Sequence, residues 1–249
     1  MIYKTKAIII SSTEVKEYDR FYGIFCCDQG KKQIVAKGVR KITAKLACGL
    51  EPITYSEIFL AEGRNFDRVT GVIINNQFTE IKKNLEKIQE IRKFFKIINN
   101  LLIEKSLEIL ENKELFEGLV FYLEAMDSKS ENKPKLKVLK LAIIWKIIYW
   151  LGFQPQIFNC FNCSEKIQEQ DFYQIILPSG IVCNKCLKFN QVNSRSQKVS
   201  KEILKILRIY NQKDIKTSFK LKLSPKQYNE IRVLTILALD HILGKRVDL

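Results

Sequence analysis

The sequence has only one histidine, His241, in its 249 residues. Histidine is the commonest catalytic base and a common metal ligand, so a single one, distant from the cysteines, argues against a histidine-centred site. The sequence also has no P-loop, GxSxG, HExxH or GxGxxG motif. It therefore lacks the signatures of several classes of nucleotide-binding and hydrolytic enzyme. We therefore expect a binding protein and not an enzyme, with no catalytic residue.

Long hydrophobic runs are also missing. The most apolar stretch, residues 141–153, carries Lys146 and is shorter than the ~20 residues that a membrane span needs. It is typical of a buried helix. The N-terminal sequence has a short apolar run and no small-residue cleavage site. We expect a cytoplasmic protein without a membrane partner.

Acidic residues are scarce relative to basic ones: 27 Asp and Glu against 42 Lys and Arg, a net charge of +15. A protein this basic usually binds polyanions, chiefly nucleic acid. The excess is uneven. Residues 188–249 carry 14 basic and five acidic side chains, a net charge of +9, and residues 31–45, KKQIVAKGVRKITAK, contain no acid.

The first 78 residues have the pattern of a small β-barrel. Five short runs rich in apolar and β-branched residues are separated by turn signals such as Asp28-Gln29-Gly30 and Glu62-Gly63. The runs cover residues 6–11, 20–28, 32–39, 55–62 and 68–75. Five strands in so short a segment favour an OB-fold barrel, which binds nucleic acid in many proteins.

From Thr79 the hydrophobic spacing changes to three and four residues, which indicates helices. Helices are expected from residue 79, over about 106–126, up to about 151, after Ser200, and from Ser224 to Gly244. The predicted fold class is α+β and multidomain. It comprises an OB-fold over 1–78 and a helical domain over 79–249, with a cysteine-rich insert at about 157–190.

The insert contains two CxxC pairs, formed by Cys160 with Cys163 and by Cys183 with Cys186. This spacing is typical of a four-cysteine zinc ribbon, in which one structural Zn²⁺ is closed off from solvent by four thiolates. Iron in a rubredoxin-like site, an incompletely used site, a catalytic metal and redox-active thiols are weaker alternatives. Disulfides are disfavoured in a reducing compartment. The other cysteines, Cys26, Cys27 and Cys48, are expected to be small buried apolar side chains.

The acid-free basic segment is the candidate DNA-binding site. OB-fold barrels bind single strands through a basic groove that follows the phosphates, with aromatic rings stacking on bases. A solvated charged face is the alternative. The barrel aromatics available for stacking are Phe21, Tyr22, Phe25, Tyr55 and Phe59, although alternate strand positions must fill the core. The candidate phosphate contacts are Lys31, Lys32, Lys37, Arg40, Lys41 and Lys45.

The order of these motifs resembles the RecO family of bacterial recombination mediators over the length of the chain. Residues 17–41, EYDRFYGIFCCDQGKKQIVAKGVRK, resemble the family stretch E-x-DR…F…G…AKG-x-RK, and residues 46–70 resemble its continuation. The four cysteines match a zinc site found in many members, and LDHILGKRV at 239–247 resembles the closing helix. Two departures are Ser164, where Gly is common, and Ala44, where Ser is common.

The resemblance implies an N-terminal OB-fold, a helical domain, a zinc-ribbon-like insert and a non-catalytic function. It further implies binding of single- and double-stranded DNA, annealing of complementary strands, and action with RecR. Together these would help load RecA onto DNA coated by single-strand binding protein, whose C-terminal tail would contact the helical domain. It also implies association with the nucleoid.

Two other readings compete with the mediator. A zinc-ribbon regulator of transcription or of RNA would prefer one sequence, whereas a mediator accepts any single strand. A zinc-dependent hydrolase or deaminase would need an open metal position, which four thiolates do not leave.

Overall fold

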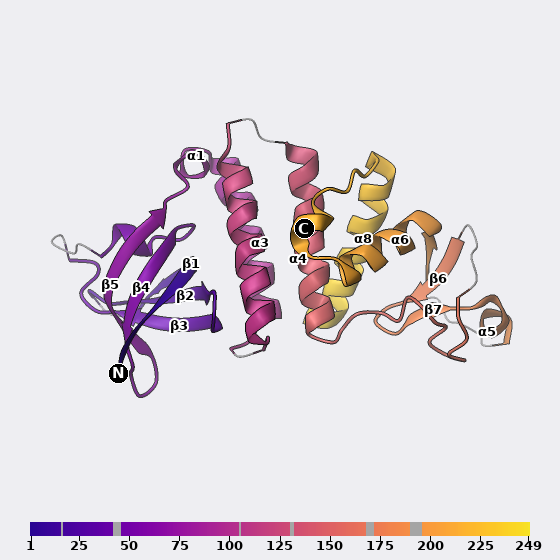
Figure 1. The fold of residues 1–249 in the computed structure, drawn as a ribbon, viewed down its shortest axis with the longest axis horizontal. Helices are drawn as coiled ribbons and strands as arrows, with labels where there is room; N and C mark the ends of the chain where they lie inside the picture. The colour runs from indigo at the N-terminus through magenta and orange to yellow at the C-terminus, as the bar shows by residue number, and fades with distance from the viewer. Residues whose placement is uncertain (16, 42–45, 105, 130–131, 168–171, 190–195) are drawn as a thin grey trace. The chain divides into compact units, whose positions relative to one another are not determined.

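The computed structural model describes residues 1–15, 17–41, 46–104, 106–129, 132–167, 172–189 and 196–249 (Figure 1). The fold is mixed α+β, with an N-terminal sheet followed by helices, as predicted. The chain divides into two compact units, Met1–Asn132 and Lys133–Leu249. Within the described residues, each helix is too short or too polar to reach across a bilayer.

All five predicted strands are present in the first unit. They close into a barrel in the order β1-β2-β3-β5-β4, and the β3–β5 contact is the one parallel pairing among the described strands. That pairing is short and joins only Ile34 with Asp67 and Val35 with Arg68. The strands are β1 (Ile2–Glu14), β2 (Arg20–Cys26), β3 (Gly30–Ala36), β4 (Tyr55–Ala61) and β5 (Asp67–Asn76).

The barrel interior is filled by alternate side chains, because successive residues of a strand point to opposite faces. On β4, Ser56, Ile58 and Leu60 are buried, whereas their neighbours are partly exposed. Each fully buried aliphatic or aromatic side chain contributes roughly 1.5–3 kcal/mol to folding. The core includes Ala7, Ile9, Tyr22, Ile24, Cys26, Ile34, Ala36, Leu50, Ile58 and Leu60.

Side-chain contacts reinforce the short parallel pairing that closes the barrel. The Asp67 carboxylate at the start of β5 accepts a hydrogen bond from the Tyr3 hydroxyl and forms an ion pair with Lys32 of β3. Its other oxygen accepts the Gly63 N–H at 3.1 Å, which fixes the β4–β5 hairpin. Asp67 therefore connects β1, β3 and the hairpin.

The first unit continues past residue 78 through three α-helices. The helical pattern that begins at Thr79 is interrupted at Asn84, whose side chain accepts the Lys87 N–H and caps a new helix. The two longer helices, α2 and α3, pack against barrel strands. The helical elements of this unit are η1 (Cys48–Leu50), α1 (Thr79–Lys82), α2 (Leu85–Leu101) and α3 (Ile109–Asp127). Cys26 lies in the core, as expected, but Cys27 is only partly buried and Cys48 is exposed in η1, contrary to the expectation of buried positions.

In the second unit, helix α4 (Lys133–Trp150) is buried around much of its circumference, which explains the apolar run from residue 141. It begins just before Pro134, because proline is tolerated in the first turn of a helix. Helices α6, α7 and α8 pack against α4. They span Lys201–Gln212, Ile215–Ser218 and Pro225–Leu243.

The ends of α8 agree with the sequence prediction. Ser224 and Gln227 form a reciprocal capping box, Pro225 occupies the first turn, and Gly244 ends the helix with φ +63°. A small three-stranded sheet, β7-β6-β8, completes the unit. It contains β6 (Phe172–Ile176), β7 (Gly180–Val182) and β8 (Ser196–Ser200), and α5 (Asn184–Phe189) follows β7.

Candidate metal centre and nucleic-acid interface

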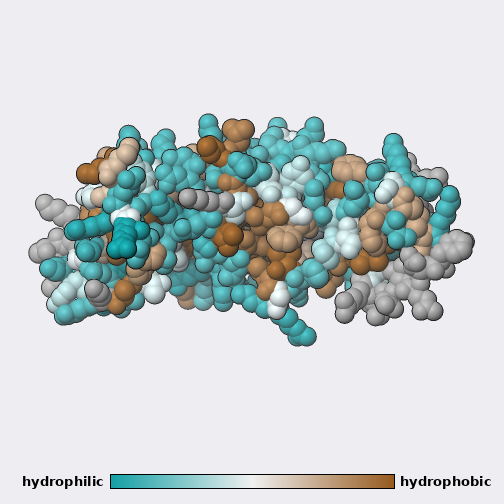
Figure 2. Space-filling view, turned by 90° about the horizontal axis from the view of Figure 1, so that it is seen from below, coloured by the Kyte–Doolittle hydropathy of each residue, from teal (hydrophilic) through white to brown (hydrophobic). Residues whose placement is uncertain are grey.

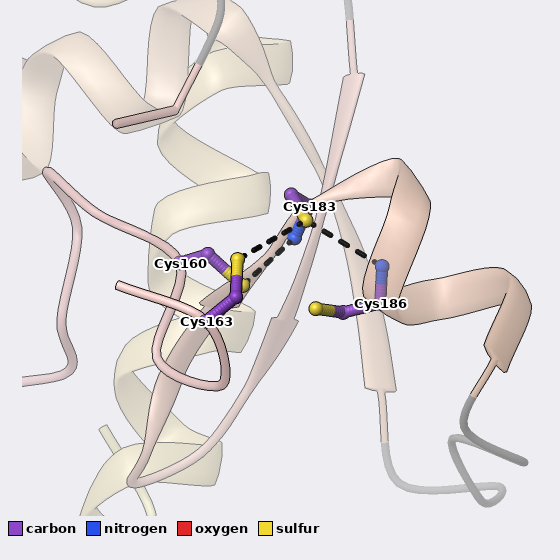
Figure 3. Close-up of side chains that lie close together, drawn as sticks. All are labelled: Cys160, Cys163, Cys183 and Cys186. Carbon is purple, nitrogen blue, oxygen red and sulfur yellow. Dashed lines mark hydrogen bonds between the residues drawn. The ribbon is translucent and has the colours of Figure 1, made fainter. Parts of the chain in front are cut away.

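The four cysteines of the two CxxC pairs lie together in the second unit (Figure 3). Cys160 and Cys163 come from the loop after α4, Cys183 directly follows β7, and Cys186 lies on α5. Their sulfur atoms all lie within 4.8 Å of one another, and the Sγ atoms of Cys163 and Cys183 are 3.7 Å apart. The β6–β7 hairpin therefore returns the second pair to the first.

This arrangement fits a tetrahedral metal ion. With zinc–sulfur bonds of about 2.3 Å, the edge of a regular tetrahedron of thiolates is about 3.8 Å. The 3.7 Å separation of Cys163 and Cys183 matches that edge. Four sulfur ligands suit zinc or iron and leave no position for a reacting water. The cluster can hold one metal ion in a closed structural site.

Backbone N–H groups donate to sulfur atoms of this cluster and stabilise the thiolate form of Cys160. The Cys183 N–H donates to Cys160 Sγ at 3.3 Å, and the Cys186 N–H donates to Cys183 Sγ at 3.5 Å. Burial of the Cys160 thiol opposes ionisation, but N–H donors from Cys183, Cys163 and Asn162 outweigh it, so its pKa is lowered to about 6. Metal binding needs this deprotonated form.

Backbone hydrogen bonds hold the first CxxC turn, in which one residue has a strained backbone conformation. The Cys160 N–H donates to the Glu165 carbonyl, and the Ser164 N–H donates to the Cys160 carbonyl. Ser164 has φ +59°, in the left-handed region that glycine adopts freely. The turn therefore requires the conformation for which glycine is suited, although this chain has serine there.

A second contact fixes the loop to the hairpin. Gln156 and Gly180 form a parallel bridge, and the Ile181 N–H donates to the Gln156 carbonyl at 2.8 Å. A Cβ atom at Gly180 would lie 2.5 Å from that carbonyl oxygen, so only glycine allows this approach. The close contact aligns the Cys160 loop with the Cys183 turn.

Two of the six predicted phosphate contacts are engaged within the first unit. The Lys31 ammonium donates to the carbonyls of Asn99 and Leu102 at the end of α2, at 2.8 Å each. Lys32 forms the ion pair with Asp67 and lies over the Tyr3 ring. Both side chains are only partly exposed, so their main contacts are with the protein itself.

Three of the six, Lys37, Arg40 and Lys41, project into solvent from the turn after β3. The backbone of this turn is held against the β1–β2 connection: the Gly38 N–H donates to the Asp19 carboxylate and the Arg40 N–H to the Tyr18 carbonyl. The three cations are therefore displayed from a fixed backbone. Lys45 lies outside the described residues.

Other groups join this turn that the basic pattern did not single out. Glu14 at the end of β1 pairs with Arg20 at 2.9 Å and with Arg40 at 3.2 Å, so two arginines share one carboxylate. The hydrogen bond from Arg20 and the nearby Arg40 charge lower the pKa of Glu14. Lys41 lies over the exposed Tyr18 ring. The cluster keeps a net positive charge.

The structure also separates buried from available aromatics. Tyr22 and Phe25 are in the interior, and Tyr55 packs edge-on against Phe116. Phe21 instead forms a surface pair with Phe66, with ring centroids 4.7 Å apart. Phe66 was missed because it follows a hairpin turn and belongs to no strand pattern. Its sequence signal is the flanking pair Arg64 and Arg68.

The second unit carries its own exposed cations. Many basic side chains of the C-terminal helices and their connections are exposed, in line with the +9 net charge after residue 187. The face drawn in Figure 2 is largely hydrophilic, with separate apolar patches. The exposed cations include Lys205, Lys213, Lys216, Lys220, Lys222, Lys226, Lys245 and Arg246.

The described residues thus combine a five-stranded barrel, with exposed cations on the turn after β3, and a helical unit that carries a four-thiol cluster. Comparison with known families is specific. Residues 1–78 match the family model "Recombination protein O N terminal", and residues 97–248 match "Recombination protein O C terminal". The chain belongs to the recombination protein O family.

Curated relatives agree with this assignment. A Dehalococcoides mccartyi protein named DNA repair protein RecO is 30% identical over 93% of this chain and 87% of its own length. Proteins of the same name from Roseiflexus and Desulforamulus reducens are 27% and 23% identical. They align with 98% and 99% of this chain, and with 82% and 91% of their own lengths.

Proposed function

We propose that this protein is a non-catalytic DNA-binding mediator of recombinational DNA repair. Family membership over both units carries the proposal, and the relatives' printed name supplies the process. The proposed domains are a DNA-binding OB-fold over 1–78, which is the span of the N-terminal family match, and a helical domain over 79–249. The cysteine insert at about 157–190 is proposed as zinc-ribbon-like.

The barrel is proposed to bind DNA phosphates with little sequence preference. Lys37, Arg40 and Lys41 are exposed cations on a fixed turn. Arg20 lies beside this turn because it pairs with Glu14, the carboxylate that also pairs with Arg40. Such contacts are made to phosphate oxygens, which are the same for every base. The Phe21–Phe66 pair is the proposed stacking surface for unpaired bases.

Annealing follows from cations on both units. Two complementary strands repel each other through their phosphates, and a protein that binds both screens that repulsion. The exposed lysines of residues 198–246 supply a second basic surface besides the turn after β3. We propose that this surface binds a second strand, whether single or in a duplex, or the acidic C-terminal tail of single-strand binding protein.

The remaining partners are proposed from the family resemblance. RecR would act with this protein, and the pair would help load RecA onto DNA that is coated by single-strand binding protein. This activity belongs to the bacterial cytoplasm, at the nucleoid. The sequence-specific zinc-ribbon regulator is not favoured, because the family match covers both units and not the insert alone.

The metal is proposed to be one structural Zn²⁺ held by Cys160, Cys163, Cys183 and Cys186. The support is the all-thiolate donor set and the 3.7 Å sulfur separation. When bound, the ion would fix the two CxxC turns to each other. This chain's own residues supply the four thiol ligands and the N–H donors that stabilise the thiolate form of Cys160.

Strand annealing tests the proposed function. Two complementary oligonucleotides are coated with single-strand binding protein, and duplex formation is followed with and without this protein over a salt series. We expect acceleration that declines as salt rises, because released counterions oppose phosphate contacts at high salt. No acceleration at any salt, with tight binding to one RNA or duplex sequence, would contradict the proposal.

A further inference from the structure

A groove of about 320 Å³ lies between strand β1 and helix α2, inside the first compact unit. Ser11 and Ser12 line it from β1, and Arg92, Lys96 and Asn99 line it from α2. The α2 residues are four and three positions apart, so they lie on one face of the helix. The groove has hydroxyl groups on one wall and cations on the other.

Strand β1 has a free edge beside this groove. Its ladder with β4 ends at Ile8, and Ile9 then exchanges backbone hydrogen bonds with the segment at Ile53 and Thr54. The ladder with β2 continues from Ser11 to Glu14. In the described chain, β1 beyond Ile9 is therefore paired with strands on one side only. A free strand edge presents backbone N–H and C=O groups for binding.

The two cations of the groove have no partner among the residues that the structure describes. Arg92 and Lys96 are exposed, and no carboxylate belongs to the described groove lining. The two lysines at the C-terminal end of helix α1 differ, since Lys82 contacts Glu51 and Lys83 contacts Glu80. Two uncompensated cations in a concave surface concentrate positive potential there.

We propose that this groove binds the phosphate backbone of single-stranded DNA and extends the interface at Lys37, Arg40 and Lys41 onto helix α2. The inference rests on the proposed function. Strands rise about 3.3 Å per residue, so Ser11 lies about 10 Å along β1 from Glu14, whose carboxylate holds Arg40. A strand bound at the turn thus reaches the groove by following one edge of β1.

The occupant is a sugar–phosphate backbone and not a set of bases. Phe95, the aromatic residue of the groove, is only 2% exposed and offers no free ring face for stacking. The available groups are the Arg92 guanidinium, the Lys96 ammonium, the Asn99 amide, two serine hydroxyls and the strand edge, which match phosphate and sugar oxygens. Neither family-model match, over residues 1–78 and 97–248, includes Arg92 or Lys96.

The test compares two charge-matched double variants of the full chain, Arg92→Gln with Lys96→Gln and, as a control, Lys4→Gln with Lys113→Gln. The control lysines are exposed and lie at the other end of β1 and on α3. Binding is measured with oligothymidines of about 6 and about 20 nucleotides, which bracket the ~4–16-nucleotide site of one barrel. We expect the groove variant to lose about tenfold in affinity for the longer oligonucleotide and much less for the shorter.

Lysine acetylation supplies a direct second readout on the unmodified protein. With the longer oligonucleotide bound, Lys96 should be protected from acetylation, whereas Lys113 should react at its rate in free protein. Equal affinity of the two double variants, or an unprotected Lys96 in the complex, overturns the groove assignment while DNA binding itself stands. Absence of any single-strand binding by the wild-type protein overturns the proposed function as well.

Discussion

The Sγ atoms of Cys163 and Cys183 lie 3.7 Å apart, although the residues are 20 positions apart in the chain. That distance joins the loop after α4 to the end of β7 and is suited to a shared metal ion (Figure 3). It brings the two CxxC pairs into one cluster, and it supports the proposed structural role of the cysteines, which can be tested separately from the proposed DNA binding.

Removing one ligand should therefore destabilise the insert. We expect Cys183→Ser to abolish stoichiometric metal in the purified protein and to make the segment after Gln156 sensitive to proteolysis. Metal analysis and limited proteolysis measure the two effects. Cys48→Ser, which changes an exposed cysteine outside the cluster, is the control and should keep both properties. Full metal content in Cys183→Ser would contradict the four-thiolate site.

The positive φ of Ser164 predicts that glycine is better at this position. A left-handed conformation costs a non-glycine residue roughly 1–2 kcal/mol, part of which glycine's larger loss of chain entropy offsets. Ser164→Gly should therefore stabilise the metal-bound turn by up to about 1 kcal/mol, seen as slower metal loss to a chelator. Ser164→Ala removes the same hydroxyl but keeps the strain. An equal gain in Ser164→Ala would contradict the argument.

Lys31 and Lys37 should separate stability from DNA binding. Lys31→Met removes the ammonium that binds two carbonyls at the end of α2, and we expect the free energy of unfolding to fall by about 1–3 kcal/mol. Lys37→Met changes an exposed side chain, so stability should move by less than about 0.5 kcal/mol while DNA affinity falls. Denaturant unfolding and oligonucleotide titration of both variants decide this. The reverse pattern would assign the phosphate contact to Lys31.

The raised pKa of Tyr3 predicts that the protein loses stability in alkaline solution. Burial and its hydrogen bond to Asp67 raise the pKa of Tyr3 to about 12, and Lys32 only partly opposes this. Because the folded pKa exceeds the ordinary value of 10, the stabilisation is complete below pH 10 and is lost as pH rises towards 12. The difference in free energy of unfolding between wild type and Tyr3→Phe should therefore become smaller as the pH rises from 10 towards 12. A constant difference in unfolding free energy would contradict the assignment.

Much of the fold could be read from the sequence because it depends on local patterns. Alternation and turn residues located the barrel strands, and Ser224, Pro225 and Gly244 marked both ends of α8. Strand β8 was missed because its sequence, SQKVS, has a single apolar residue and depends on pairing with β6. Pairing between distant segments has no local signal.

The site was predictable to different extents for the same reason. The spacing of the two CxxC pairs predicted a shared site, and the structure brings all four thiols together. Charge runs do not reveal which cations are already paired. Lys31 and Lys32 belong to the same run as Lys37, yet their partners are on α2 and β5, far away in the chain. The sequence pattern did not single out Arg92 and Lys96, because the groove that they line forms only where α2 faces β1.

The most direct test of the account is the salt dependence of single-strand binding. Fluorescence anisotropy of a labelled oligothymidine gives the affinity of wild type and of Lys37→Gln, Arg40→Gln, Lys41→Gln combined. Each lost phosphate contact lowers the logarithmic salt slope by about 0.7, so the triple variant should bind more weakly with a slope reduced by about 2. An unchanged affinity and slope would show that the turn after β3 does not contact DNA and would contradict the central claim.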